Sequence, residues 1–188
     1  RFSIESAETT YQQVLSGEGG PYIGVTFEYS ASLEAEAALA APRLLSMPCA
    51  ARSARSSVTH TRVGVVGAGL FGKAVLLPAL KKVPNITLET LAARSSANTY
   101  HAAKTSGFRQ CTTDHREILD DPAIDAVVIL TPHQTHASMV TEALQAGKHL
   151  FVEKPLCVNE TELRALVETR RERPEPVLMV GYNRRYSP

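Results

Sequence analysis

One short stretch decides the fold of this chain, and it runs Val63-Gly64-Val65-Val66-Gly67-Ala68-Gly69-Leu70-Phe71-Gly72. An apolar run that predicts a strand leads through G-x-G-x-x-G into a helical pattern. Gly67 permits a tight turn, the missing Cβ of Gly69 lets a pyrophosphate approach the backbone, and Gly72 lets the helix pack closely. The helix start at Leu70 and Phe71 offers unpaired N–H groups to the phosphates. The stretch therefore predicts a dinucleotide-binding turn.

The same turn also matches part of a second nucleotide motif. Residues 67–73 fit the first seven positions of the P-loop pattern G-x-x-x-x-G-K-[ST]. The next residue is Ala74, which has no hydroxyl to bind Mg²⁺. The sequence therefore favours dinucleotide binding over an ATPase.

Short apolar runs alternate with helical patterns through the rest of residues 61–188. The apolar runs predict strands at 62–66, 87–93, 111–112, 126–130, 149–152 and 177–181. The spacing of apolar residues predicts helices at 70–82, 98–106, 136–146 and 160–173. Strands that alternate with helices form a parallel sheet covered on both faces. We therefore expect an α/β fold, a doubly wound parallel sheet that forms a Rossmann NAD(P)-binding domain.

The end of the second strand indicates which cofactor this domain prefers. An NAD site usually has an acid there to hold the ribose hydroxyls, whereas this chain has Arg94 and Ser95. A guanidinium can pair with the 2′-phosphate of NADP, which a carboxylate would repel. We expect NADP to be preferred over NAD, the alternative being that Arg94 is a solvated loop residue.

Two segments precede this domain. Residues 1–29 predict a helix, capped by Ser3 and stopped by the glycines at 17, 19 and 20, and then a strand at 22–29. One helix and one strand cannot form a core, so we interpret them as the remnant of a preceding domain. Residues 30–60 are rich in Ala, Ser and Arg, with one short helix predicted at 33–39, and we interpret them as a linker.

The composition excludes several classes of protein. The 188 residues carry 20 basic and 19 acidic side chains, and a net charge of +1 gives no electrostatic footprint for nucleic acid or an anionic membrane. No apolar run approaches the roughly 20 residues that span a bilayer, and the first residues do not resemble a signal peptide. The three cysteines are scattered without a C-x-x-C pair, so we expect a reducing, cytoplasmic location and no metal site.

Four motifs follow one another along the chain: Val66-Gly67-Ala68-Gly69-Leu70-Phe71-Gly72, Thr131-Pro132-His133-Gln134-Thr135-His136, Ala146-Gly147-Lys148-His149-Leu150-Phe151-Val152-Glu153-Lys154-Pro155-Leu156 and Gly181-Tyr182-Asn183-Arg184-Arg185-Tyr186-Ser187-Pro188. In order and spacing they resemble the N-terminal half of the glucose–fructose oxidoreductase, inositol dehydrogenase and rhizopine catabolism (Gfo/Idh/MocA) family. The resemblance covers about two-thirds of the chain. It implies a domain that binds NADP or NAD, in a dehydrogenase of a sugar, polyol or related alcohol.

The resemblance also implies roles for single residues. Thr131 and Pro132 match the segment that passes beside the nicotinamide. His136 matches a position at the start of the next helix, where packing is an equally open interpretation. Glu153-Lys154-Pro155 matches the family signature at the end of the fifth strand, in which Pro155 is typically cis. Lys154 would reach the nicotinamide ribose and the reacting hydroxyl, and it is the candidate catalytic residue.

The family commonly places an Asp-x-x-x-His pair in a C-terminal domain. This chain has no Asp after Asp125 and no His after His149, so the probable acid and base are absent. We expect the chain alone to be inactive, with its small-molecule substrate and any homo-oligomer contacts provided by a missing C-terminal domain. The alternative is a non-catalytic nucleotide-binding module, a redox sensor or regulatory partner. Residues 1–29 loosely resemble the C-terminal end of zinc-type medium-chain dehydrogenases, which implies a fragment of a bi-domain oxidoreductase.

Overall fold

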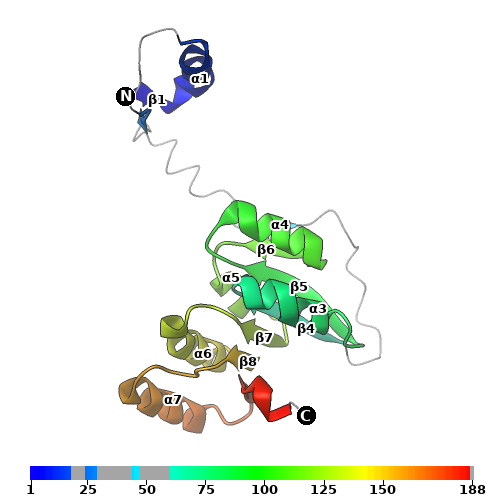
Figure 1. Cartoon of the computed structure of the whole chain (residues 1–188). Coiled ribbons are helices and arrows are strands. Elements are labelled where there is room, and N and C mark those ends of the chain that lie inside the picture. Colours follow the sequence, from blue (N-terminus) through cyan, green and yellow to red (C-terminus); the bar gives the residue numbers. More distant parts are fainter. Residues whose placement is uncertain (18–23, 29–43, 47–59, 187–188) are drawn as a thin grey trace. The chain divides into compact units, whose positions relative to one another are not determined.

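The computed structural model describes residues 1–17, 24–28, 44–46 and 60–186 (Figure 1). The chain divides into two compact units, Arg1–Pro42 and Arg43–Pro188. In the described part of the chain, no helix is both long and apolar enough to cross a membrane.

The larger unit is built on a seven-stranded sheet with the order β3-β6-β5-β4-β7-β8-β9. Its strands are Leu45–Ser46 (β3), Thr61–Val66 (β4), Ile86–Ala92 (β5), Gln110–Thr112 (β6), Ala126–Ile129 (β7), His149–Glu153 (β8) and Leu178–Gly181 (β9). All neighbouring strands are parallel except β3, which pairs antiparallel with β6. From β6 to β9 the strands follow the order of a Rossmann fold, with β4 as its first strand. The predicted doubly wound parallel sheet is confirmed.

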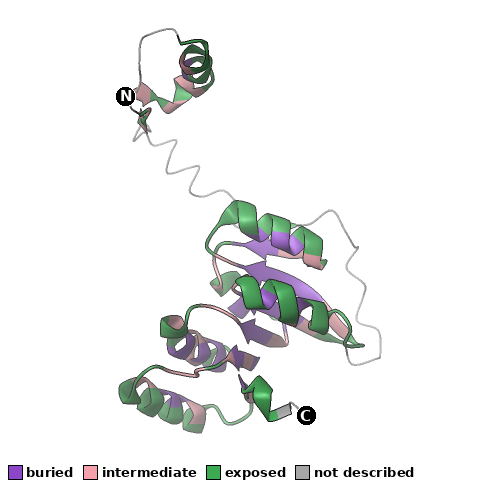
Figure 2. Ribbon diagram, viewed as in Figure 1, coloured by how far each residue is buried: buried purple, intermediate pink, exposed green. Residues whose placement is uncertain are grey.

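Helices connect the strands and cover both faces of the sheet. They are η2 (Gly72–Leu76), α3 (Leu77–Leu80), α4 (Ser96–Ser106), α5 (Arg116–Leu119), η3 (His133–Thr135), α6 (His136–Gln145), α7 (Glu160–Glu172) and η4 (Asn183–Tyr186). The central strands β4, β5 and β7 are mostly buried, and the outer faces of the helices are exposed (Figure 2).

The first crossover helix differs from the continuous helix predicted at 70–82. Residues Gly72–Leu76 form a π-helix, in which the N–H of Leu77 donates to the carbonyl of Gly72. Pro78 follows immediately in α3 and explains the irregularity, because it has no N–H and its ring crowds the carbonyl four residues earlier. The helix ends at Leu80, two residues earlier than predicted.

Two apolar clusters form the core, one on each face of the sheet. On one face α5, α6 and α7 pack on β7 and β8, with Ile118, Val140, Leu144 and Leu166 buried. On the other face α3 and α4 pack on β4 and β5, with Leu77, Leu91, Ala103 and Phe108 buried. The second cluster also holds Cys111, and burial raises the pKa of its thiol.

The smaller unit contains one short parallel pair of strands, β1 (Phe2–Ser3) and β2 (Phe27–Glu28). The predicted helix is present as η1 (Ile4–Ser6) followed by α1 (Ala7–Ser16). The predicted cap is wrong in detail, because Ser3 makes no capping bond and its hydroxyl donates to the nearby carboxylate of Glu5 instead. Gly17 ends the helix in the left-handed conformation, with φ of 75°.

Several sequence-based expectations lie outside the described residues. These are the glycines at 19 and 20, both ends of the strand predicted at 22–29, the helix at 33–39, Cys49, and residues 187–188 of the last motif. Within the described part of that predicted strand, 24–28, only Phe27–Glu28 form a strand. The same holds for most of the linker predicted at 30–60. Within that segment, Leu45 and Ser46 form β3 at the edge of the sheet.

Candidate functional site

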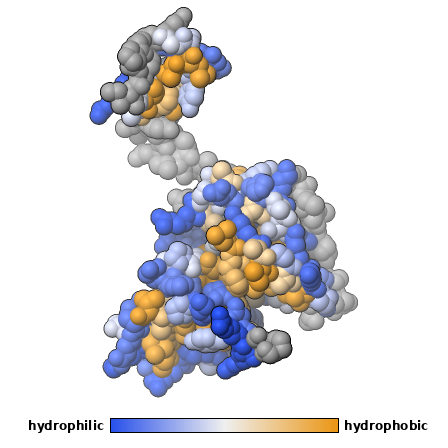
Figure 3. All heavy atoms as spheres, in the orientation of Figure 1, coloured by the Kyte–Doolittle hydropathy of each residue, from blue (hydrophilic) through white to orange (hydrophobic). Residues whose placement is uncertain are grey.

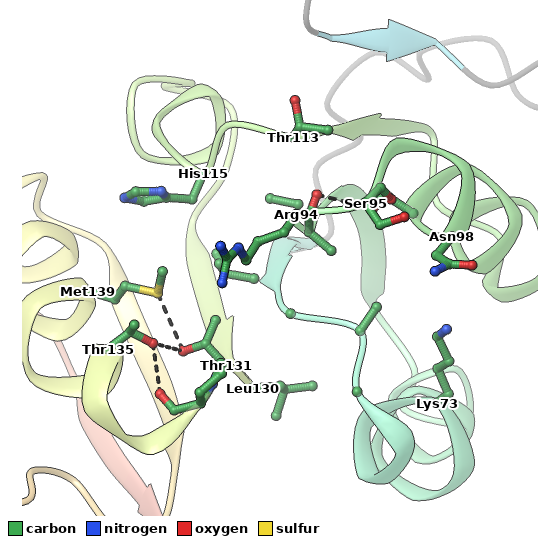
Figure 4. A pocket seen from close by; sticks show the side chains of 18 residues that line it. Lys73, Arg94, Ser95, Asn98, Thr113, His115, Leu130, Thr131, Thr135 and Met139 are labelled. Atoms are coloured by element: carbon green, nitrogen blue, oxygen red, sulfur yellow. Dashed lines mark hydrogen bonds between the residues drawn. The ribbon is translucent and has the colours of Figure 1, made fainter. Parts of the chain in front are cut away.

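A cleft of about 500 Å³ opens at the carboxyl ends of β4, β5 and β7 (Figure 4). Strand β4 lies between β5 and β7, so the order of the sheet reverses at this point. Open α/β sheets bind ligands in the crevice at such a reversal. The residues that line the cleft are Val66, Gly67, Ala68, Gly69, Lys73, Ala92, Ala93, Arg94, Ser95, Asn98, Thr99, Thr113, His115, Leu130, Thr131, Pro132, Thr135 and Met139.

The glycine turn forms the floor of the cleft. Gly67 has a φ of 100°, and a Cβ there would lie 2.6 Å from the carbonyl oxygen of Leu130. Its N–H donates to the carbonyl of Ala92 at 2.7 Å, which ties the turn to β5. A Cβ on Gly69 would meet nothing within 4 Å, so the space above this residue is open. The turn can therefore accommodate a group that approaches the backbone at Gly69.

The other residues predicted around the turn do not line the cleft. Gly72 is buried, and a Cβ there would lie 2.9 Å from Cδ1 of Leu130, so it allows close packing against the residue that follows β7. Leu70 is 89% exposed and Phe71 is 39% exposed. Apolar side chains at the surface of the larger unit stand out in Figure 3. Only the backbone N–H groups of Leu70 and Phe71 are suited to a phosphate.

The wall formed by the β5–α4 loop is positively charged. Arg94 and Ser95, the residues predicted to select the cofactor, both line the cleft, and Lys73 lines it from η2. The loop is fixed by Thr99, whose hydroxyl donates to the carbonyl of Ser95 at 2.6 Å and whose N–H donates to the same carbonyl at 2.8 Å. No Asp or Glu occurs among the described lining residues. This wall is therefore suited to an anionic group.

The opposite wall follows β7 and contains the predicted residues Thr131 and Pro132. The hydroxyl of Thr135 lies 2.8 Å from Oγ1 of Thr131 and 2.8 Å from the carbonyl oxygen of Pro132. The hydroxyl of Thr131 in turn donates to Sδ of Met139 at 3.5 Å (Figure 4). These contacts hold the loop at a fixed place on the edge of the cleft.

His136 is fully buried behind that wall and is not among the residues that line the cleft. Its Nδ1 lies 2.6 Å from the carbonyl oxygen of Pro155, and its Nε2 lies 2.8 Å from the carbonyl oxygen of Thr131. The ring thus joins the loop after β7 to the loop after β8. This geometry favours a positioning role over direct contact with a cofactor.

Glu153 ends β8 and Lys154 and Pro155 follow it at the same edge of the sheet, but none of the three is among the residues that line the cleft. The peptide bond between Lys154 and Pro155 is cis, so the predicted isomer is confirmed. The carboxylate of Glu153 accepts the backbone N–H of Lys154 at 3.0 Å. Lys154 itself is exposed, so its ammonium is accessible to a ligand at this edge.

Some lining residues were not predicted as site residues, namely Lys73, Asn98, Thr113, His115, Thr135 and Met139. Thr113 and His115 follow β6, and the rule that ligands bind at the carboxyl ends of parallel strands points to them. His115 is held by Glu142 of α6, with 2.7 Å between Nε2 and the carboxylate. Lys73 is visible in the sequence only as the lysine of the rejected P-loop pattern.

The described residues contain no group of three or more His, Cys, Asp or Glu side chains that could hold a metal ion. The rings of His133 and His136, which are three residues apart, meet edge to face at 5.6 Å between centroids.

Known proteins share this fold and these motifs. The family model described as "Oxidoreductase family, NAD-binding Rossmann fold" (GFO_IDH_MocA) matches residues 61–182. The scyllo-inositol 2-dehydrogenase (NAD(+)) of Bacillus subtilis is 34% identical over 129 residues, which are 69% of this chain and 37% of that protein. The chain thus spans little more than a third of the length of this curated relative.

Solved structures that are similar to this chain include one complex with NADP and one with NADH. A 3-ketoreductase from Actinomadura kijaniata in complex with NADP superposes with a TM-score of 0.60 at 29% identity, over 65% of this chain and 39% of that one. A levoglucosan dehydrogenase in complex with NADH gives a TM-score of 0.60 at 33% identity, over 67% of this chain and 36% of that one.

Proposed function

The chain belongs to the Gfo/Idh/MocA oxidoreductase family, and we propose that its residues 61–188 are the NAD(P)-binding domain of a dehydrogenase. The whole enzyme would transfer a hydride between a nicotinamide cofactor and a sugar, polyol or related alcohol. The observation that carries this proposal is the cleft over the glycine turn at the reversal point of the sheet.

The residues of the cleft fit an adenine dinucleotide. The open space above Gly69 leaves room for a pyrophosphate next to the backbone. Arg94 and Ser95 on the positive wall would hold the adenine ribose and its 2′-phosphate, so NADP would bind more tightly than NAD. Thr131 and Pro132 on the opposite wall would face the nicotinamide. When bound, the nicotinamide supplies or accepts the hydride.

Lys154 is the proposed catalytic residue. Its exposed amino group would donate a hydrogen bond to the reacting oxygen and orient it. The carboxylate of Glu153 would hold the backbone of this segment. A proton acceptor for the alcohol is also needed, and we propose that it and the substrate pocket belong to a further domain of the whole protein.

A second candidate function is a nucleotide-binding module without chemistry of its own, such as a redox sensor. It is favoured by the position of Lys154, which is not among the residues that line the cleft. The dehydrogenase proposal also includes a division of the chain into a remnant at 1–29, a linker at 30–60 and the binding domain at 61–188. It further includes a cytoplasmic location, a homo-oligomer of the whole protein, and no nucleic-acid or membrane partner.

The proposal is tested by calorimetric titration of the purified chain with NADPH and then with NADH. We expect saturable binding of both, with NADPH the tighter ligand. Arg94→Asp should weaken NADPH by at least about tenfold and reverse the order of the two affinities, because a carboxylate repels the 2′-phosphate.

Arg173→Asp is the matched control, since Arg173 is exposed at the end of α7 and the change in charge is the same. An unchanged NADPH-to-NADH ratio in Arg94→Asp would refute the NADP preference. A folded chain that binds neither nucleotide would refute the proposed function.

A further inference from the structure

A buried ring joins the two loops at the carboxyl ends of β7 and β8. The ladder between these strands ends at Ile129 and Val152. Beyond that point the ring of His136 faces the carbonyl oxygen of Thr131, 2.8 Å from Nε2, and the carbonyl oxygen of Pro155, 2.6 Å from Nδ1. Among the described residues, no other side chain hydrogen-bonds to both loops.

The position of this ring is fixed by the helix that carries it. His136 is the first residue of α6, and its side chain is fully buried. The same helix is anchored in the apolar core by Val140, Ala143 and Leu144, which are all fully buried. The ring has no contact with solvent, and packed interiors deform little. The separation of the two loops is therefore set by the width of the imidazole.

Each loop contains a residue that the proposed function uses. Thr131 lines the cleft, on the wall where the nicotinamide would lie (Figure 4). Lys154 directly precedes Pro155, and its exposed amino group would orient the reacting oxygen. Hydride transfer requires that the reacting groups be held within a narrow range of distances and angles. The separation of these loops would therefore affect the nicotinamide and not the adenosine, whose ribose would bind at the loop after β5.

We propose that His136 is a positioning residue for the nicotinamide, because it fixes the two loops between which that group would bind. The inference rests on the proposed function and extends it to a side chain outside the cleft. Since His136 acts through the loops, its removal should loosen the nicotinamide end of the site and leave the adenosine end intact. A merely structural role would affect every ligand of the cleft alike.

The test compares NADH with ADP-ribose, which has the same adenosine, pyrophosphate and ribose but lacks the nicotinamide. Each is titrated by calorimetry into the whole chain and into three variants. His136→Leu removes both links, whereas an amide nitrogen can take the place of Nδ1 in His136→Asn and of Nε2 in His136→Gln. We expect the preference for NADH over ADP-ribose to fall about tenfold in His136→Leu and about threefold in each amide variant.

Val140→Ala is the matched control, since Val140 is fully buried one turn further along α6 and its side chain cannot hydrogen-bond to either loop. It should lower the unfolding temperature and leave the preference for NADH unchanged. Thermal unfolding verifies that each variant is folded at the temperature of the titration. If His136→Leu does not fold, the two amide variants provide the test.

Failure of the positioning role and failure of the proposed function give different results. If the unsubstituted chain prefers NADH and the folded His136 variants keep that preference, the positioning role is wrong and the nucleotide-binding function stands. The same holds if the unsubstituted chain binds NADH and ADP-ribose equally, because the loops then add nothing to the affinity. If the folded chain binds neither ligand, the proposed function is wrong and the positioning role fails with it.

Discussion

At the scale of single residues, His136 is a buried side chain with a hydrogen-bond partner at each ring nitrogen. Both of its ring nitrogens face backbone carbonyl oxygens, of Pro155 at 2.6 Å and of Thr131 at 2.8 Å. A carbonyl oxygen only accepts, so each of these bonds forms when the ring nitrogen that faces it carries the hydrogen. The side chain is fully buried, which leaves water no access to replace either bond. His136 thus links the loops of Thr131 and Lys154.

We predict that His136→Leu destabilises the fold by about 2–4 kcal/mol, because it removes a fully buried ring that bridges the carbonyls of Thr131 and Pro155. His136→Asn should cost less, since its amide can still donate to one of them. Urea unfolding of the three proteins measures the difference. Equal stabilities for His136→Leu and the unsubstituted chain would mean that the two bonds do not stabilise the fold.

The cofactor prediction for Arg94 also belongs to the scale of residues. The Arg94 side chain is exposed and lines the cleft, so its substitution should change the affinity for NADPH and leave stability unaffected. A variant that lowered the unfolding temperature as much as a core substitution does would contradict this view.

At the scale of elements, the central strand β4 depends on close contact with a helix on one face. A Cβ on Gly64 would lie 2.3 Å from Cγ2 of Ile118, which is itself fully buried in the core. Ile118 belongs to α5, the short helix that the sequence analysis did not predict. Four residues are too few to show a helical period, so this packing partner could not be found from the pattern.

We predict that Gly64→Ala destabilises the larger unit by about 1–3 kcal/mol, because the added methyl group overpacks the contact with Ile118. Gly69→Ala is the matched control, since a Cβ there meets nothing within 4 Å. Denaturant unfolding gives both values. If the two variants lost the same stability, the contact between β4 and α5 would not be the cause.

At the scale of the whole molecule, the two units have separate sheets. In the described residues of Arg1–Pro42, β1 pairs with β2, whereas β3 to β9 form the sheet of Arg43–Pro188. The family match starts at residue 61, so it says nothing about residues 1–29. Their resemblance to a medium-chain dehydrogenase stays a prediction.

We predict that a chain starting at residue 43 unfolds at the same temperature as the whole chain and binds NADPH with the same affinity. The reason is that the cleft and both apolar clusters lie entirely within residues 43–188. Calorimetry measures both quantities on the shortened chain. A marked loss of either would show that the first unit contributes to the fold or to the site.

The sequence by itself determined the class of fold, the position of the glycine turn and the family. These features depend on local patterns, because a buried parallel strand requires an apolar run and the turn requires glycine at fixed spacing. Gly67, Gly69, Arg94 and Ser95 were found in this way, Thr131 and Pro132 were found through the family resemblance, and all six line the cleft.

Only the tertiary structure decided which side chains meet. It shows that His136 is buried between two loops, and that Lys73 and Asn98 line the same cleft as Arg94. It also shows that the first crossover helix is not continuous, because a π-helix at Gly72–Leu76 precedes the α-helix that contains Pro78. Contacts between residues distant in sequence depend on how the elements pack, and local pattern alone does not specify that packing.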